Sequence, residues 1–300
     1  MSRNFIKKEG VAQNSLARYL LGEKTGNRLK TIDELAGECG FSVGLIQAAL
    51  KTLESAGAVA VERRGRNGSF LVNMDHKLLL DFADIGNVVC AMPLPYTRLY
   101  EGLASGLKAQ FDGIPFYYAH MRGSDVRVEC LLNGVYDLAV VSRLAAQSYV
   151  DRGDVYMALE LGPHTYVGEH KLICRAGAQP IKRVGLDPRS ADQRIMTDVY
   201  FAGQSVELLD VPYHECLARI VKGDIDAVIW NVANEIELDT HGLVAQPLKG
   251  DPRFEDASEA VVLTRVDDIP IQQLLRTVVN KSALLAHQQR VLVGEQEPSY

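Results

Sequence analysis

The feature that most constrains the fold is a pair of short helices predicted between Thr31 and Gly57. Thr31 and Glu34 have the spacing of a capping box, in which each side chain can satisfy the other residue's backbone N–H. Gly40 supplies a C-terminal stop, and Ser42 can cap a second helix that ends at Gly57. Apolar residues recur at helical spacing in both segments. Two helices joined by so short a turn form a helix-turn-helix, whose second helix can lie in the major groove of DNA.

A hairpin rich in arginine and glycine follows this pair directly. Val59–Val61 and Phe70–Val72 alternate as half-buried strands, and RRGRNGSF, Arg63–Phe70, turns between them. Glycines allow a tight turn, and three arginines supply charge for phosphates or for a narrow minor groove. A solvated surface hairpin is the alternative, but the position after a helix-turn-helix favours a DNA-binding β-wing.

Charge is distributed unevenly along the 300 residues, whose formal net charge is −6. Residues 1–74 carry 11 Lys and Arg against 7 Asp and Glu, whereas residues 75–300 carry 21 against 31. The first segment is therefore +4 and the second −10. This asymmetry is typical of a basic module that faces nucleic acid on an acidic body, although a solvated basic face would also produce it.

Residues 1–74 are thus predicted to form a winged helix-turn-helix DNA-binding domain. We expect phosphate contacts from the wing and Lys51, and base-edge contacts from Ser42, Gly44 and Gln47. The candidate DNA-binding residues are Thr31, Ser42, Val43, Gly44, Gln47, Lys51, Arg63, Arg64, Arg66, Asn67 and Gly68.

The stretch LKTIDELAGECGFSVGLIQAALKTLESAGAVAVERRGRNGSFLV resembles the winged helix of GntR-type bacterial transcription regulators. Ala49–Leu53 matches the family's Ala-Leu-x-x-Leu core, and Arg63–Phe70 matches its Arg-Arg-x-x-Gly wing. The resemblance implies DNA binding. Where many members carry arginine or threonine early in the recognition helix, this chain has Val43, Leu45 and Gln47. Guanine readout by a bidentate arginine is therefore not supported on this helix.

Strands alternate with helices after a linker predicted at residues 75–87, which indicates a sheet of parallel strands covered by helices. Within this region Leu131–Arg143 recurs 89 residues later as Ile220–Asn231. Each copy has an apolar pair, then Gly-x-x-Asp, then a buried strand. Any αβ unit could produce such a string. The echo also fits two similar lobes, each with its own sheet, over residues 88–300.

Two-lobed domains of this kind resemble the type 2 periplasmic-binding-protein fold, which implies that a small ligand binds between the lobes. Ligands collect outside the carboxyl ends of strands, where helix N-termini offer unpaired N–H groups. Arginines at three such places favour an anionic ligand, although each could instead be solvated or ion-paired. The candidate ligand-binding residues are Tyr96, Thr97, Arg98, Ser124, Ser142, Arg143, Arg189, Ser190 and Asn231.

Over nearly its whole length the chain resembles the YhfZ family of transcriptional regulators. NVVCAMPLPYTRLYEGLASGLKAQFDGIPFYYAHMRG, LGPHTYVGEH and the tail LLAHQQRVLVGEQEPSY carry this resemblance. It implies an α/β chain with an N-terminal winged helix-turn-helix and a C-terminal two-lobed periplasmic-binding-protein-like domain. It does not identify an effector.

The sequence lacks the motifs of disulfide frameworks, metal sites and common catalytic sites. The five cysteines lie 40 or more residues apart, and the histidines show no metal-binding spacing, so neither a disulfide framework nor a metal site is predicted. His164, Glu169 and His170 are close in sequence, and we expect them to form a polar turn. No nucleophile elbow, P-loop or dinucleotide fingerprint occurs. No catalytic residue and no cofactor are therefore predicted.

We predict a cytoplasmic, ligand-responsive regulator that binds operator DNA as a homodimer and does not act at a membrane. The sequence has no apolar run of the kind that a secretory signal or a membrane-spanning helix requires. A C-terminal helix with Ile271, Leu274, Leu275 and Val278 on one face should pack on the body or serve the dimer, followed by a loose tail. Three alternatives stay open: a two-lobed lyase or transferase, a binding protein that serves a transporter, and a second domain that only dimerises.

Overall fold

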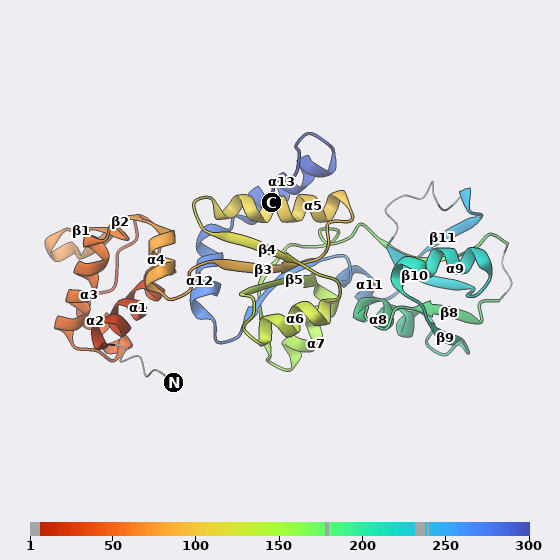
Figure 1. Ribbon diagram of the computed structural model, residues 1–300, viewed down its shortest axis with the longest axis horizontal. Helices are drawn as coiled ribbons and strands as arrows, with labels where there is room; N and C mark the ends of the chain where they lie inside the picture. Colours follow the sequence, from red (N-terminus) through yellow and green to blue (C-terminus); the bar gives the residue numbers. More distant parts are fainter. Residues whose placement is uncertain (1–6, 178–179, 232–237, 239) are drawn as a thin grey trace. The chain divides into compact units, whose positions relative to one another are not determined.

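The computed structural model describes residues 7–177, 180–231, 238 and 240–300. Two compact units make up the chain (Figure 1). The first consists of Met1–Val89, Ala109–Tyr117 and Asp267–Val279. The second consists of Cys90–Lys108, Tyr118–Val266 and Asn280–Tyr300.

The first unit contains the predicted helix-turn-helix. Its helices are α1 (Lys8–Leu20), α2 (Ile32–Cys39) and α3 (Val43–Ser55). Both arms of the capping box between Thr31 and Glu34 are present. Gly40 has a φ of 71°, a left-handed conformation that suits glycine, and it ends α2. The Ser42 hydroxyl then caps α3 by accepting a hydrogen bond from the Leu45 N–H at 3.3 Å.

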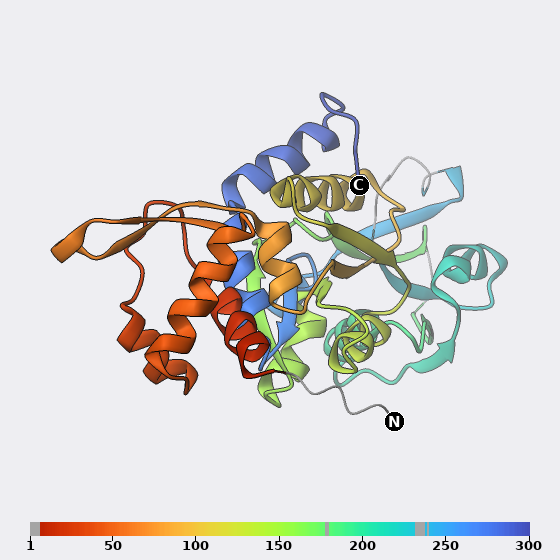
Figure 2. The same cartoon turned by 60° about the vertical axis from the view of Figure 1, so that its left-hand side comes forward.

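The predicted wing is also present, as an antiparallel hairpin of β1 (Val59–Arg63) and β2 (Ser69–Met74). Figure 2 shows this hairpin extending as a ribbon away from the helices. A short 3-10 turn, Gly65–Asn67, forms the tip. Gly65 and Gly68 both have positive φ, at 56° and 89°, so the two glycines permit the turn.

Residues of the predicted linker pack against the winged helix. Helix α4 (His76–Phe82) buries Leu79 and Leu80. The Arg18 side chain on α1 donates to the Ala83 carbonyl at 3.2 Å. The predicted domain boundaries at residues 74 and 88 stay predictions, although residues 75–87 are now seen to include this packed helix.

Two five-stranded sheets form the two lobes, as the internal echo predicted. The first sheet has the order β4-β3-β5-β12-β6 and the second β11-β7-β10-β8-β9. Both follow one plan, because each central strand has a parallel neighbour on one side and an antiparallel neighbour on the other. The first sheet comprises β3 (Val88–Met92), β4 (Phe116–His120), β5 (Leu138–Ser142), β6 (Val155–Glu160) and β12 (Ala260–Arg265). The second comprises β7 (His170–Arg175), β8 (Arg183–Leu186), β9 (Glu207–Asp210), β10 (Ala227–Asn231) and β11 (Leu243–Pro247).

The predicted α/β class is confirmed, with an N-terminal winged helix-turn-helix and a C-terminal domain of two lobes. The expectation of parallel sheets needs correction, since β12 and β7 run antiparallel beside the central strands. Both antiparallel strands lie outside the βαβ units that the sequence pattern reveals. The helices of this domain are α5 (Arg98–Lys108), α6 (Ser124–Leu132), α7 (Arg143–Asp151), α8 (Ala191–Tyr200), α9 (Cys216–Lys222), α11 (Arg253–Asp256) and α13 (Lys281–Leu292).

The internal echo has a structural cause. Gly134 and Gly223 follow α6 and α9 with φ of 69° and 84°, and the central strand of each lobe starts a few residues later. Asp226 accepts from Arg183 at 2.8 Å, and in the other lobe Asp137 lies 3.9 Å from Arg265. Each repeat thus uses a glycine to leave the helix and an aspartate that pairs with an arginine.

The C-terminal region differs from its prediction. The expected helix is α12 (Ile269–Val278), which buries Ile271, Leu274 and Leu275 within the chain. A separate helix, α13, packs closely on α5, where a Cβ at Gly106 would lie 2.9 Å from the Leu284 carbonyl oxygen. The predicted loose tail is wrong, because the Ser299 N–H donates to the Ser105 hydroxyl at 3.0 Å.

Candidate nucleic-acid interface and interlobe site

Helix α3 presents one continuous face to solvent. Its buried residues point into the winged-helix core: Ile46, Ala49, Leu50 and Leu53. The exposed residues on the opposite face include Ala48 and four predicted DNA-binding residues: Val43, Gly44, Gln47 and Lys51. The structure therefore brings the predicted recognition residues together on one side of one helix.

The three wing arginines have different surroundings. Arg63 pairs with Glu54 at 2.7 Å, and Arg64 pairs with Glu62 at 2.6 Å. Arg64 also lies over the Phe70 ring, 4.5 Å from its centroid. Arg66 has no carboxylate partner among the described residues. Of the three expected phosphate contacts, Arg66 is therefore the one whose charge is not already balanced nearby.

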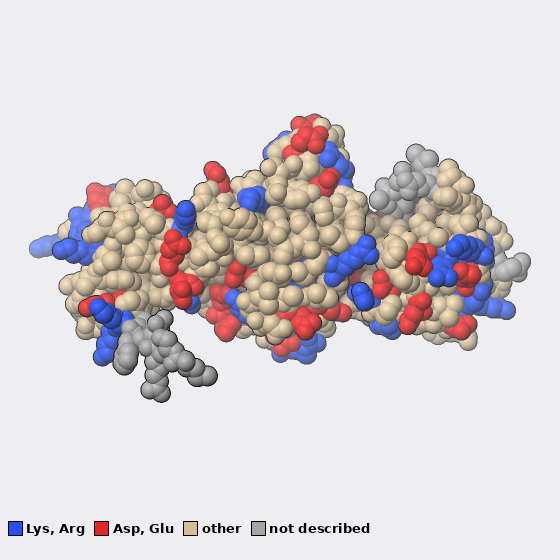
Figure 3. All heavy atoms as spheres, viewed as in Figure 1, with Lys and Arg blue, Asp and Glu red and all other residues tan. Residues whose placement is uncertain are grey.

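Arg28 is a cation that sequence analysis missed. A β-bridge joins Arg28 to Phe70 on β2 and holds it beside the wing. A Cβ at Gly68 would lie 2.7 Å from the Arg28 Nε, so glycine lets the guanidinium lie against the tip. Lys and Arg side chains project at this end of the winged helix in Figure 3. Nothing in the local sequence pattern signals a contact across 40 residues.

The remaining predicted interface residues occupy the edges of this surface. The Thr31 hydroxyl is engaged by Glu34 in the capping box, so it mainly positions α2. Asn67 and Gly68 lie in the wing tip, where their backbone N–H groups bond to Arg64 and Gly65. Both belong to the turn that presents Arg66.

Most of the predicted ligand-binding residues lie at the end of a strand or the start of a helix, and their role in binding stays a prediction. Thr97 accepts from the Tyr100 N–H near the start of α5, and Ser124 begins α6. Ser142 and Ser190 cap α7 and α8. The chain therefore presents helix N-termini from both lobes. Tyr96 accepts from Arg122 at 2.8 Å, and the Asn231 N–H donates to Tyr213 at the end of β10.

Two of the three predicted anion-binding arginines already have counter-ions. Arg143 pairs with Glu160 and lies within 3.7 Å of Asp256 and Glu259. Arg98 lies 3.4 Å from Glu101 and 3.7 Å from Glu297. Arg189 is exposed, and its carbonyl oxygen lies 3.8 Å from the position of a Cβ at Gly123 in the other lobe. Arg98 and Arg143 are thus weak candidates for an anionic ligand.

A different group of polar residues, which connects the two lobes, is a better candidate for the ligand site. The Ser142 hydroxyl of the first lobe lies 2.7 and 2.8 Å from the two carboxylate oxygens of Asp192 in the second. Asp192 therefore reaches the N-terminus of α7, the kind of position at which anions bind. We call the following group the interlobe cluster: Tyr100, Arg127, Ser142, Tyr166, Asp192 and Tyr213.

Arg127 is the cation of the interlobe cluster, and sequence analysis missed it. Its side chain is only 3% exposed. Its guanidinium donates to the Val140 and Met121 carbonyls and to the Tyr166 hydroxyl, each at 2.9 Å. Within the described ranges, no carboxylate forms a salt bridge with it. A buried charge is costly unless paired, so this guanidinium marks a place where an anion would be stabilised.

Asp192 titrates unusually. Burial raises the pKa of its carboxyl to about 6, while the hydrogen bond from Ser142 and the charge of Arg127 act in the opposite direction. Asp192 therefore takes up a proton at a higher pH than an ordinary aspartate does.

Aromatic residues from both lobes complete the surroundings. Tyr213 stacks on Trp230 with ring centroids 3.8 Å apart and an interplanar angle of 15°. Tyr100 and Tyr166 meet edge to face with centroids 5.1 Å apart. The cluster thus offers one guanidinium, hydroxyl groups and flat apolar faces, a combination that suits a small organic anion.

No described grouping of three His, Cys, Asp or Glu side chains could hold a metal ion. His164 bonds to the Gly168 carbonyl at 2.6 Å, and burial lowers the pKa of His170 to about 4. The five cysteines are free thiols. Among the helices that the structure describes, none is long and apolar enough to cross a membrane.

Comparisons with known proteins cover the whole chain. Residues 75–300 match the family described as YhfZ C-terminal domain, and residues 24–71 match a helix-turn-helix domain. The chain is 75% identical over 301 residues to "Uncharacterized protein YhfZ" of Escherichia coli K12, with both chains fully covered.

Two solved structures are also similar. The crystal structure of YhfZ from Shigella flexneri shares 75% identity with a TM-score of 0.69, covering 75% of this chain and 97% of that one. Protein AF1704 from Archaeoglobus fulgidus shares 12% identity with a TM-score of 0.50, covering 71% of this chain and 79% of that one, which indicates a common fold alone. With its C-terminal domain and its full-length relative both matched, the chain belongs to the YhfZ family.

Proposed function

We propose that the protein is a cytoplasmic, DNA-binding transcription regulator whose two-lobed domain senses a small anionic metabolite. The observation that carries the DNA-binding part is the surface of the winged helix. An exposed recognition helix lies in the same module as a wing with Arg66 and Arg28 beside its tip. The match of residues 24–71 to a helix-turn-helix domain supports the same function.

In this proposal α3 enters the major groove while the wing follows the phosphate backbone. Lys51, on the third turn of α3, lies where it can meet a phosphate. A homodimer would place two recognition helices on half-sites about one helical turn apart. This arrangement accounts for a basic module in a chain of net charge −6.

The sensing part rests on the interlobe cluster. Asp192 now occupies the N-terminus of α7, close to the buried Arg127. An effector with a carboxylate or phosphate would take this place, and the Ser142–Asp192 contact between the lobes would break. The effector can change DNA affinity only as far as its affinities for the two states of the domain differ.

Catalysis has weaker support. Ser105 and His287 form a hydrogen-bonded pair at 2.7 Å, the kind of contact that activates a serine nucleophile. Ser105 is 1% exposed, and it also accepts a hydrogen bond from the Ser299 N–H. A substrate has no access to this hydroxyl while the tail covers it, so we assign the pair a structural role between α5 and α13.

Selection from genomic fragments tests DNA binding. The full chain is mixed with sheared DNA from its source organism, and retained fragments are sequenced. We expect enrichment of discrete sites. Retention of no DNA in low salt would refute the proposed function.

Calorimetric titration tests effector binding. A panel of small carboxylates and phosphates is titrated into the full chain and into Arg127→Gln, with Arg194→Gln on the exposed side of α8 as the control. We expect at least one member to bind the wild type and the control but not Arg127→Gln. Equal binding to all three proteins would remove Arg127 from the site.

A further inference from the structure

The exposed face of α3 has a chemistry of its own. Its first two turns carry Val43, Gly44, Gln47 and Ala48, and none of these side chains is charged. Val43 is 37% exposed, so part of its apolar side chain is open to contact. The first cation, Lys51, comes one turn later. The first two turns of this face therefore lack the arginine or lysine that reads guanine.

Each base pair presents a distinct pattern in the major groove, and these side chains match one of them. Arginine or lysine reads guanine, whereas glutamine can bond in bidentate fashion to the N6 and N7 of adenine. Thymine is recognised by apolar contact with its methyl group. Gln47 supplies the first chemistry, and Val43 and Ala48 supply the second.

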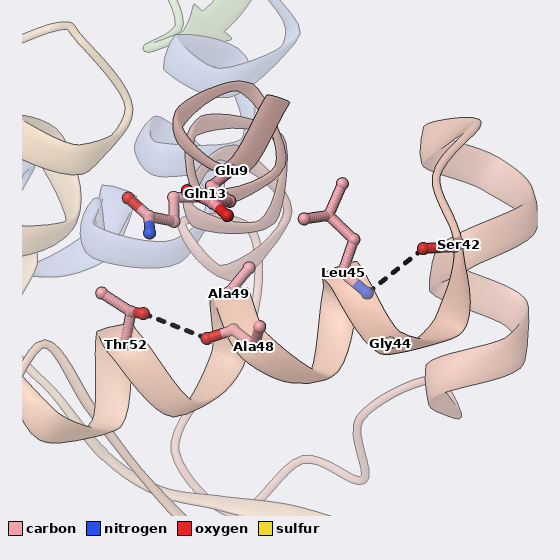
Figure 4. Close-up of a pocket in the computed structure, with 8 residues that line it drawn as sticks. All are labelled: Glu9, Gln13, Ser42, Gly44, Leu45, Ala48, Ala49 and Thr52. Atoms are coloured by element: carbon pink, nitrogen blue, oxygen red, sulfur yellow. Dashed lines mark hydrogen bonds between the residues drawn. The ribbon is translucent and has the colours of Figure 1, made fainter. Parts of the chain in front are cut away.

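The shape of the module allows the required close approach. A Cβ at Gly44 would meet nothing within 4 Å, so the helix surface is open there. A groove of about 390 Å³ lies beside α3, lined by Gly44, Ala48 and Thr52 and, across it, by Glu9 and Gln13 of α1 (Figure 4). Small side chains along this edge leave room for a thymine methyl group beside Ala48, whereas Gln47 and Val43 lie outside the groove.

We propose that each winged helix reads an A·T step in its half-site, with Gln47 bonded to adenine and Val43 and Ala48 packed on thymine methyl groups. This inference rests on the proposed function, since it assigns base identity to a helix that must first bind DNA. Lys51, one turn further along the same face, and Arg66 and Arg28 at the wing would hold the phosphates without selecting sequence.

The test uses the tightest fragment recovered from the genomic selection, as a short duplex. Single adenines are replaced by 7-deazaadenine, which lacks N7, and single thymines by deoxyuracil, which lacks the methyl group. We expect one 7-deazaadenine position to weaken wild-type binding about 5- to 20-fold. Gln47→Ala should bind weakly to both duplexes and lose no further affinity on that substitution. A thymine position should behave in the same way with Val43→Ala.

Lys51→Ala is the matched control on the same helix, and it should weaken binding to all duplexes by the same factor. G·C pairs at the positions protected by α3, or analogues without effect on wild-type affinity, would overturn this inference while leaving DNA binding intact. Failure to bind any duplex would overturn the proposed function and this inference with it. Circular dichroism of each variant shows whether the module remains folded.

Discussion

Arg66 and Arg127 carry the same guanidinium group in opposite surroundings. Arg66 is exposed at the tip of the wing, in a turn shaped by Gly65 and Gly68. Arg127 is 3% exposed and is held by two carbonyls and a tyrosine hydroxyl. Neither forms a salt bridge within the part of the chain that the structure describes. Both therefore remain able to attract an anion.

The difference in exposure indicates what each arginine can recognise. An exposed cation interacts through solvent with a polyanion, and salt weakens that interaction strongly. A buried cation cannot reach a polymer, but it strongly favours one small anion of fitting shape. Substitutions at the wing and between the lobes test this difference between the two arginines.

The largest effect is expected at the buried site. Arg127→Ala leaves the Val140 and Met121 carbonyls and the Tyr166 hydroxyl without their donor, and it leaves a cavity. We expect a loss of about 3 kcal/mol in the free energy of unfolding, measured by urea denaturation. Arg194→Ala, an exposed change on α8, should alter it by less than about 0.5 kcal/mol. Similar losses for both would mean that Arg127 is not specially held.

A smaller effect is expected from Asp192, and it depends on pH. Burial raises the pKa of this carboxyl to about 6 in the folded chain, so the folded state keeps a proton that the unfolded state releases at lower pH. The contribution of this carboxyl to the free energy of unfolding should therefore fall as pH rises from about 4 to about 6 and then level off. Asp192→Asn cannot ionise, so we expect it to be more stable than the wild type by about 1–2 kcal/mol at pH 8, with no difference near pH 4.

Thermal unfolding across this pH range measures the difference. Asp198→Asn, an exposed change on the same helix, is the control, and its difference from the wild type should not vary with pH. A difference between Asp192→Asn and the wild type that does not vary with pH would contradict the raised pKa.

The smallest effect is expected from a paired wing arginine. Arg64 already interacts with Glu62 at 2.6 Å, so removing it also frees a carboxylate near the DNA. We expect Arg64→Ala combined with Glu62→Ala, which leaves net charge unchanged, to change duplex affinity less than about twofold. A tenfold loss would show that Arg64 leaves Glu62 and binds a phosphate directly.

The sequence predicted the elements of the winged helix well because local rules govern them. A capping box, glycine stops and apolar periodicity define α2 and α3 without reference to the rest of the chain. The two-lobe plan was visible because a local motif repeats around Gly134 and Gly223.

The sites were less predictable, because they depend on contacts between distant residues. Arg28 reaches the wing through a bridge to Phe70, and Asp192 reaches Ser142 across 50 residues. The sequence pattern correctly placed Ser142 at the N-terminus of a helix, but it could not show that Arg143 is surrounded by carboxylates. Nor could it show that the tail is held by Ser105. Pairing in three dimensions decides which charges stay available.

The salt dependence of duplex binding tests the central claim most directly, that Arg28 and Arg66, which form no salt bridge with the described residues, bind the DNA backbone. The affinity of the full chain is measured across salt concentrations for the wild type and for Arg28→Ala combined with Arg66→Ala. We predict that the double variant binds every duplex more weakly and that the slope of log affinity against log salt is shallower by about 2 for each bound winged helix, about 4 for a homodimer. Identical slopes for the two proteins would contradict the account.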